Sequence, residues 1–258
     1  MFDLKGKTAL VTGGAKGIGE GISMELARCG ANVIVNYHTS SDGKAICEKL
    51  NSLGAKCIAV QADVTDKAQV DSMIAQGMDA FGGIDILVNN AAYQCNIPFD
   101  EYDDQHLSRI FHTNLYGYIL CMQGVLPYMK EKRYGKIINI SSVHAKRPTN
   151  FDPGYSMTKG AIKMLTRESA LELADYHINV NSVEYGYVDI GVKSGKPRDV
   201  VESGLADEER LFPFSKLSLA DRINEPKEAA HVVAFLASDE AEMIHGTAIR
   251  ADSGTILA

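Results

Sequence analysis

The chain has 258 residues, of which 45% are hydrophobic and 23% are charged, and its formal net charge is −7. The length is normal for one α/β domain, and the apolar fraction is sufficient for a hydrophobic core. The negative charge argues against electrostatic nucleic-acid binding. No apolar run reaches the length that spans a bilayer, and the N-terminus lacks the charged and apolar regions of a signal peptide. We therefore expect a cytoplasmic protein with no membrane and no nucleic-acid partner.

The cysteines give no sign of a metal site or of a disulfide framework. They form no CxxC pair and no Cys/His cluster, and their number is odd: Cys29, Cys47, Cys57, Cys95 and Cys121. Zinc sites and disulfide scaffolds have characteristic cysteine spacings, which this set lacks. We predict reduced thiols in a cytosol and no bound metal.

Short apolar runs alternate with longer amphipathic segments along the chain. The runs span residues 8–14, 32–37, 56–63, 84–91, 136–142, 178–186 and 247–254. Strands that are apolar throughout are typical of a parallel sheet covered on both faces, and their alternation with helical periodicity indicates βαβ units. We predict one α/β domain over residues 1–258. Its core is a Rossmann-like, doubly wound parallel sheet of about seven strands with helices on both faces.

The segment 188–214 breaks this alternation. It contains glycine, proline and charged residues but no strand pattern. An irregular stretch of this kind between a strand and a helix is typical of a lid or a substrate loop, and we predict that function here.

A glycine-rich turn, TGGAKGIG (12–19), follows the first strand and leads directly into a helix. Glycine allows positive φ and close approach of the backbone to an anion. The helix N-terminus adds unpaired N–H groups that suit a diphosphate. Such a turn alone can be a tight βα connection, but its place within a βαβ unit favours dinucleotide binding. The predicted contacts are Gly13, Lys16, Gly17, Ile18 and Gly19.

The second strand ends in VNYHTS, with no carboxylate. In NAD-preferring Rossmann proteins an acidic residue here binds the ribose 2′-hydroxyl and would repel a 2′-phosphate. Asn36, Thr39 and Ser40 can donate hydrogen bonds, and Lys16 adds a positive charge. We predict that NADP(H) is favoured, with contacts from Asn36 and Tyr37. No arginine follows Asn36, so NAD(H) remains an alternative cofactor.

A set of motifs extends over essentially the whole chain. They are, in order, TGGAKGIG, Asp63 after the third strand, NNAA (89–92), Asn114, Ser142 and YSMTK (155–159). In this set and order the chain resembles the short-chain dehydrogenases/reductases. The resemblance implies a hydride transfer between a nicotinamide cofactor and a carbonyl or secondary alcohol.

Two Tyr-x-x-x-Lys pairs occur, Tyr155–Lys159 and Tyr128–Lys132. The family requires a serine at the end of a strand thirteen residues before the tyrosine. Ser142 meets this requirement for Tyr155, whereas the position thirteen residues before Tyr128 is a leucine in a helical pattern. We therefore interpret Tyr155 and Lys159 as the catalytic pair and the other pair as coincidental.

The i, i+4 spacing places Tyr155 and Lys159 on one helix face. A free phenol has a pKa near 10, too high for a base at neutral pH. A nearby ammonium can lower it by ~2–3 units, which corresponds to ~3–4 kcal/mol. We expect Lys159 to act on Tyr155 in this way, and Tyr155 to transfer the proton.

The resemblance also implies roles for the surrounding residues. Lys159 would bind the nicotinamide ribose, Ser142 would orient the substrate carbonyl, and Asn114 would hold a water that relays protons toward Lys159. Asp63 is expected near the adenine. The other predicted cofactor contacts are Val64, Asn89, Asn90, Ala91, Gly186 and Val188, with Tyr155 and Lys159 at the nicotinamide end.

Two segments depart from the family pattern. Ala92 stands where the family usually has the glycine of NNAG. In EYGYVDI (184–190), Tyr185 replaces a proline and Ile190 replaces a threonine that helps to hold the cofactor. The loss of one hydroxyl contact costs about 1 kcal/mol. The change is either neutral drift or a reshaped pocket in which Tyr185 or Tyr187 faces the substrate.

The predicted pocket lining is polar. His144 lies two residues after Ser142 and points to the same side if the strand continues, where it could bind a sugar hydroxyl; a water-exposed loop histidine is the alternative. The other candidates are Ser142, Tyr93, Gln94, Asn96, Asn150, Asp152 and Tyr187. This lining favours a sugar, polyol or small hydroxy-ketone. NYHTS and SSVHAKRP look most like the glucose-dehydrogenase and ketoacyl-reductase-like branch.

Two other functions remain open. A 3-oxoacyl thioester reductase needs a basic docking surface for an acidic carrier protein, and the acidic segment RESALELADYH argues against it. A cofactor-binding sensor with weakened catalysis has no need of Ser142, Tyr155 and Lys159 together. Family members usually pair through two long helices, here about 104–132 and 154–175, so we expect a homodimer or homotetramer.

Overall fold

The computed structural model describes residues 2–39, 43–95, 97, 99–149, 152–190 and 224–254. Within this part of the chain, seven strands form one parallel sheet in the order β3-β2-β1-β4-β5-β6-β7. The strands are β1 Thr8–Val11, β2 Asn32–Tyr37, β3 Cys57–Gln61, β4 Ile86–Asn89, β5 Gly135–Ser142, β6 Ile178–Tyr185 and β7 Ala248–Ala251. The predicted doubly wound, seven-stranded sheet is confirmed.

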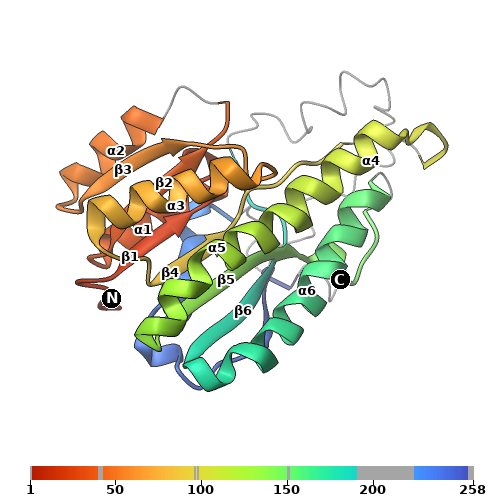
Figure 1. Cartoon of the computed structure of the whole chain (residues 1–258). Helices are drawn as coiled ribbons and strands as arrows, with labels where there is room; N and C mark the ends of the chain where they lie inside the picture. The colour runs from red at the N-terminus through yellow and green to blue at the C-terminus, as the bar shows by residue number, and fades with distance from the viewer. Residues whose placement is uncertain are drawn as a thin grey trace.

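Helices cover both faces of the sheet, as Figure 1 shows for α3, α5 and α6 on the face turned toward the viewer. The helices are α1 Gly17–Arg28, α2 Gly43–Ser52, α3 Lys67–Phe81, α4 Asp104–Phe111, α5 Gly117–Lys132, α6 Pro153–Leu173 and α8 Pro226–Ala237. Among the described residues, no helix is both long and apolar enough to cross a membrane.

Strand β1 shows how the sequence produces two cores. Ala9 and Val11 pack with α1, α2 and α8, whereas Leu10, between them, packs with α3, α5 and α6. All three side chains are fully buried. Because successive side chains of a strand point to opposite faces, a strand must be apolar at every position to fill both cores.

The order of the strands creates the site. The chain leaves β1 toward β2 and β3 on one side, and later passes to β4 on the other side of β1. In open α/β sheets, ligands bind at such a switch point, outside the carboxyl ends of the strands. The loops after β1 and β4 therefore face one another at the expected binding edge.

The long helical region before β5 contains a π-helical turn, His112–Tyr116, between α4 and α5. The Gly117 N–H donates to the carbonyl of His112, five residues earlier. A Cβ on Gly117 would lie 2.9 Å from Cγ2 of Val64, so the glycine lets the helix approach the end of β3. π-turns are frequent at functional sites, and this one carries the buried side chain of Asn114.

One prediction about the cysteines was wrong. Cys47 of α2 and Cys57 of β3 form a disulfide, with their Cα atoms 5.3 Å apart. The turn between α2 and β3 brings the two residues together, and no cysteine spacing motif in the sequence indicates this pairing. Cys29, Cys95 and Cys121 are free and buried.

Candidate active site

The turn after β1 has a shape that requires glycine. Gly13 and Gly17 have φ angles of 61° and 55°, in the left-handed region that other residues avoid. A Cβ on Gly19 would lie 2.1 Å from the carbonyl oxygen of Gly13. Asn90 closes the turn from β4, because its Nδ2 donates to the carbonyls of Thr12 (2.9 Å) and Gly13 (3.2 Å). The result is a rigid backbone cradle at the N-terminus of α1.

A cleft of about 860 Å³ opens at this cradle and extends along the carboxyl ends of β1 to β4. Its size lies at the upper end of the range for cofactor sites, about 300–1,000 Å³. Most of the residues predicted to contact the cofactor line it: Gly13, Lys16, Gly17, Ile18, Gly19, Asn36, Tyr37, Asp63, Val64, Asn90 and Ala91. Tyr155, Lys159, Gly186 and Val188 lie outside this lining.

Sequence reasoning missed part of the lining. Gln105, Ser108, Arg109 and His112 come from α4 and the π-turn. Their helical spacing is visible in the sequence, but nothing in it shows that this helix face borders the cleft. The guanidinium of Arg109 lies 4.0 Å above the ring of Tyr93, so a cation stands beside the loop that follows NNAA.

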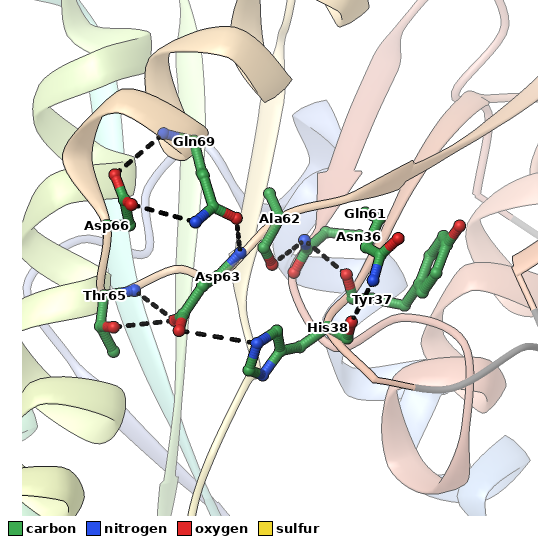
Figure 2. A network of polar contacts seen from close by, with 9 residues as sticks. All are labelled: Asn36, Tyr37, His38, Gln61, Ala62, Asp63, Thr65, Asp66 and Gln69. Carbon is green, nitrogen blue, oxygen red and sulfur yellow. Dashed lines mark hydrogen bonds and ion pairs between the residues drawn. The ribbon is translucent and has the colours of Figure 1, made fainter.

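Asn36 differs from its predicted role as a donor to a phosphate. Its side chain is 2% exposed, and its Oδ1 accepts from the Gly13 N–H at 3.2 Å. Its Nδ2 donates to the Ala62 carbonyl at 3.0 Å, a contact drawn in Figure 2. The amide therefore fixes the glycine turn to the end of β3. Tyr37, His38 and Thr39 are left to face the cleft, and Ser40 lies outside the described residues.

The far end of the cleft is built around Asp63 (Figure 2). Its Oδ1 accepts from the backbone N–H and the hydroxyl of Thr65, at 2.9 and 2.8 Å. Its Oδ2 lies 3.6 Å from Nε2 of the exposed His38. Asp66 then caps α3 by accepting from the N–H groups of Ala68 and Gln69, an N-terminal cap of the usual type. These bonds hold the chain between β3 and α3 in place beside the cleft.

The catalytic candidates come from the end of β5 and the first turns of α6. The Ser142 hydroxyl, which donates to the Tyr185 carbonyl at 3.5 Å, lies close enough to Tyr155 to lower the pKa of its phenol. The Lys159 Nζ lies 5.3 Å from the centroid of the Tyr155 ring and donates to the Ile140 carbonyl at 2.9 Å. Ser142, Tyr155 and Lys159 thus form one group. The other pair, Tyr128 and Lys132, lies on the outer part of α5, where Lys132 pairs with Asp85.

The expected effect of Lys159 on Tyr155 differs from what the structure gives. Burial raises the pKa of Tyr155 to about 12, with the Asp152 charge adding to the rise and the Ser142 hydrogen bond opposing it. Burial also lowers the pKa of Lys159 to about 7. Sequence reasoning assumed a fully charged lysine, but an ammonium enclosed without a carboxylate partner loses its proton readily. Lys159 therefore holds its proton much less firmly than an exposed lysine does.

Asn114 uses its side chain to position the loop after β4. Its Oδ1 accepts from the Tyr93 N–H at 2.7 Å, and its Nδ2 donates to the Tyr93 carbonyl at 2.9 Å and to the Thr158 hydroxyl at 3.2 Å. The amide therefore joins this loop to α6. The predicted water relay through Asn114 stays a prediction.

Among the substrate candidates, His144 packs against the ring of Tyr155. Its ring meets the Tyr155 ring edge-on, with centroids 6.3 Å apart, and burial lowers its pKa. Its Nδ1 lies 2.9 Å from the Arg147 carbonyl. Because a carbonyl only accepts, we assign the proton of the neutral ring to Nδ1, which leaves Nε2 as an acceptor.

The other substrate candidates have different settings. Tyr93 lines the cleft, Gln94 is exposed, and Tyr187 is partly buried with its carbonyl accepting from Asn224. Asp152 is fully buried and caps α6, so it does not face a substrate. Asn96 and Asn150 lie outside the described residues.

The two replacements in residues 184–190 that depart from the family pattern, Tyr185 and Ile190, lie in different surroundings. Tyr185 points into the core: it is 3% exposed, and its hydroxyl donates to the Ala229 carbonyl of α8 at 2.5 Å. It does not face the substrate. Ile190 lines the cleft, and a Cβ on Gly17 would lie 3.3 Å from its Cγ2. Of the predicted lid, residues 191–214 lie outside the described part of the chain.

Comparison with known proteins identifies the family. The family model for short chain dehydrogenases matches residues 7–200. The chain is 33% identical to 5-keto-D-gluconate 5-reductase of Escherichia coli K12, over all of this chain and 98% of that protein. It is 36% identical to 3-oxoacyl-[acyl-carrier-protein] reductase of Staphylococcus aureus Mu50, with 96% and 97% covered.

A solved structure agrees along the whole chain. The crystal structure of a short-chain alcohol dehydrogenase from Sinorhizobium meliloti 1021 superposes with a TM-score of 0.90 at 30% identity, covering 100% of this chain and 99% of that one. The chain belongs to the short-chain dehydrogenase/reductase family. Members of this family are oxidoreductases that act on carbonyl and hydroxyl groups with a nicotinamide cofactor.

Proposed function

We propose that the chain is an NADP(H)-preferring enzyme that interconverts a carbonyl and a secondary alcohol on a polar, sugar- or polyol-like substrate. The observation that carries the proposal is the group formed by Ser142, Tyr155 and Lys159, with the acceptor nitrogen of His144 on a ring that meets the phenol edge-on. The similarity to a keto-gluconate reductase supports the same substrate class.

The cleft fits a dinucleotide. The glycine cradle leaves no room for a Cβ at Gly19, and the N–H groups at the start of α1 face the position that suits a diphosphate. Asp63 and Val64 would hold the adenine end, and Asn90 and Ala91 the middle. When bound, the nicotinamide supplies or accepts the hydride.

Proton transfer falls to Tyr155. In reduction, its phenol gives a proton to the carbonyl oxygen, and the Ser142 hydroxyl donates a hydrogen bond to the same oxygen. With a pKa of about 12, the phenol is protonated at neutral pH and ready to act as an acid. In the oxidative direction the same group takes up the proton as the phenolate.

The preference for NADP(H) is supported by the charges at the end of β2. No carboxylate ends that strand, and the exposed side chains of Lys16, His38 and Thr39 line the cleft there. A 2′-phosphate bound there would lie beside the side chains of Lys16, His38 and Thr39, all of which can donate a hydrogen bond. Asp63 is the one carboxylate in the described lining, and it already accepts two hydrogen bonds from Thr65.

The polar substrate is supported by His144 and Arg109. A neutral imidazole with Nε2 as acceptor pairs with a hydroxyl on the carbon next to the reacting one. Arg109, stacked on Tyr93, suits a negatively charged or hydroxylated group farther out. The similarity to an oxoacyl reductase supports the alternative of a 3-oxoacyl thioester, in which the carbons next to the reacting one carry no hydroxyl for His144.

We propose that two copies of the chain pair through α5 and α6. Met157, Met164 and Leu171 are 50%, 54% and 78% exposed, and they recur every seven residues on α6. This spacing places them on one helix face. Exposed apolar side chains in such a row are typical of a helix that packs against a second copy.

The test is a fluorescence titration with NADPH and NADH, followed by a turnover screen of keto-sugars, keto-sugar acids, diketones and acetoacetyl thioesters. We expect NADPH to bind at least about tenfold tighter, a difference of about 1.4 kcal/mol, and turnover of a hydroxy-ketone that is lost in Tyr155→Phe. Tyr128→Phe, which changes the coincidental pair, is the matched control and should keep full activity. Tight cofactor binding with no turnover of any carbonyl would contradict the proposal and favour a sensor.

A further inference from the structure

A buried carboxylate lies beside the catalytic tyrosine but takes no part in the chemistry proposed above. Asp152 is completely buried, three residues before Tyr155. Its Oδ1 accepts from the Tyr155 N–H at 2.9 Å and thereby caps α6. Its own N–H donates to the Thr149 hydroxyl at 2.7 Å. The cap fixes the backbone of the residue that must transfer the proton.

The same carboxylate holds two segments from the other side of the site. Its Oδ2 accepts from the Cys95 N–H at 2.9 Å, in the loop that carries Tyr93 and Gln94. Its Oδ1 accepts from the Tyr102 hydroxyl at 2.5 Å. The Tyr102 hydroxyl also lies 3.2 Å from the Cys95 thiol. A helix cap alone needs one of these bonds, so the others point to a second task.

Tyr102 reaches Asp152 because the second position of α6 is a glycine. A Cβ on Gly154 would lie 2.8 Å from the Tyr102 hydroxyl and 3.2 Å from its Cε1. The ring therefore packs directly on the first turn of α6, against backbone that any other residue would cover. Packing and hydrogen bonding act on the same turn, one residue before Tyr155.

The charges around Asp152 act on the reacting phenol. Burial raises the pKa of Asp152, and the hydrogen bonds from Tyr102, Tyr155 and Cys95 oppose that rise, as does the nearby His144. Arg109 adds a positive charge on the side of Cys95. In turn, the negative charge of Asp152 contributes to the raised pKa of Tyr155.

We propose that Asp152 and Tyr102 are positioning residues that lock the substrate loop 93–95 onto the first turn of the catalytic helix. The lock keeps the loop and the phenol of Tyr155 at a fixed separation, and the carboxylate adds to the effect of burial, which keeps the phenol protonated. Its effect on turnover rests on the proposed function, whereas its effect on the loop does not.

The first test needs no substrate. A thiol reagent is added to the native protein, and the labelling rate of each free cysteine is followed by peptide mass spectrometry. In Tyr102→Phe we expect the Cys95 rate to rise about tenfold, since loss of a hydrogen bond to a charged group loosens the loop. Cys29 and Cys121, both buried and free, are internal controls and should keep their rates.

Tyr134→Phe is the matched control variant. Tyr134 also donates its hydroxyl to an aspartate, Asp239, at 2.9 Å, but it follows α5, before β5, away from the loop. It should leave Cys95 labelling unchanged. NADPH affinity should stay within about twofold in Tyr134→Phe, because Tyr134 does not line the cofactor cleft and a contact that is not made contributes nothing to binding.

The second test separates positioning from mere stability. Asparagine also caps helices well, so Asp152→Asn retains a cap while it removes the charge. With a substrate identified in the turnover screen, we expect KM to rise about tenfold or more in this variant. The acid limb of the oxidative pH profile, which follows deprotonation of Tyr155, should move to lower pH because the Asp152 charge no longer raises the pKa of the phenol. Tyr102→Phe, which retains the carboxylate, should raise KM with a smaller change in that limb.

Two results would overturn the proposal. One is Cys95 labelling in Tyr102→Phe that equals labelling in Tyr134→Phe. The other is an unmoved acid limb in a folded, active Asp152→Asn. If Asp152→Asn does not fold, the labelling of Tyr102→Phe decides alone. If the protein turns over no substrate, the proposed function fails while the labelling result still stands for or against the lock.

Discussion

The Lys159 ammonium donates a hydrogen bond to the carbonyl of Ile140, 2.9 Å away, and the Tyr118 hydroxyl donates to the same oxygen at 3.1 Å. Lys159 is 2% exposed, and no carboxylate pairs with it among the described residues. The backbone therefore fixes the direction of the lysine side chain, but it does not offset the cost of burying its charge.

This arrangement predicts that Lys159, the proposed catalytic lysine, destabilises the fold at neutral pH. The pKa of Lys159 falls from 10.5 to about 7 on folding, so the unfolded chain binds more protons between these values. Stability from this group therefore rises with pH across that window, and the cost is fully present below pH 7. Lys159→Met should abolish turnover yet raise the unfolding free energy at pH 6 by roughly 1–3 kcal/mol.

Thermal unfolding of both proteins at pH 6 and pH 10 checks this. The Ile140 carbonyl keeps Tyr118 as its donor in the variant, so no new unpaired group offsets the gain. The gain should shrink toward pH 10. Equal destabilisation at both pH values would show that the lysine is not buried as a charge.

The position of Asn36 predicts that its loss weakens the binding of NADPH and NADH equally, whether or not the cofactor carries a 2′-phosphate. Asn36→Ala removes the acceptor of the Gly13 N–H and the donor to the Ala62 carbonyl. We expect a loss of roughly 2–3 kcal/mol of stability, because buried groups are left unpaired, and a similar weakening of NADPH and NADH. Parallel fluorescence titrations measure this. A loss confined to NADPH would restore the interpretation of Asn36 as a phosphate donor.

For His38 we predict a loss of affinity that is confined to NADPH. Its imidazole is exposed, lines the cleft and lies 3.6 Å from Asp63. His38→Ala should weaken NADPH binding about 3- to 10-fold and leave NADH binding nearly unchanged, as expected for one hydrogen bond to a charged phosphate. The same titrations at two salt concentrations provide the check, since an exposed contact of this kind weakens with salt. Unchanged NADPH affinity would place the phosphate elsewhere, nearer Lys16.

The fold could be predicted from the sequence because its signal is repeated. Most strands contain a short apolar run, and most crossovers have helical periodicity, so a local error such as the irregular segment 188–214 does not change the topology. The proposed catalytic group could be located because Ser142, Tyr155 and Lys159 lie at fixed spacings on a strand end and a helix face.

Other features depend on partners from distant segments. The amide of Asn36 takes its partners from the turn after β1 and from β3. From the sequence, Asp152 is expected to be a polar residue of the pocket. Its hydrogen bonds with Cys95 and Tyr102 show that it instead joins buried segments. The pKa values of Tyr155 and Lys159 depend on how deeply they are enclosed. A one-dimensional pattern contains none of these relationships.

Tyr185 predicts a stability effect without a catalytic one. Its hydroxyl donates to the Ala229 carbonyl in the core beneath α8. Tyr185→Phe should cost about 1 kcal/mol of stability and leave kcat and KM unchanged. Denaturant unfolding and steady-state kinetics of the same preparation measure both. A change in KM larger than about threefold, or roughly 0.7 kcal/mol, would show that the residue reaches the substrate after all.

The Cys47–Cys57 disulfide predicts a stability that depends on redox conditions. The bridge joins residues ten apart in sequence, and closing a loop of this length stabilises by roughly 2–3 kcal/mol in the chain-entropy model. Addition of a thiol reductant should lower the unfolding temperature by several degrees, because about 1 kcal/mol shifts it by roughly 2–4 °C in a chain of this size. The double variant Cys47→Ser/Cys57→Ser should have the lower unfolding temperature without any reductant, and the reductant should not change it further. An unfolding temperature of the wild-type protein that does not change with the reductant would show that the bridge does not contribute to stability.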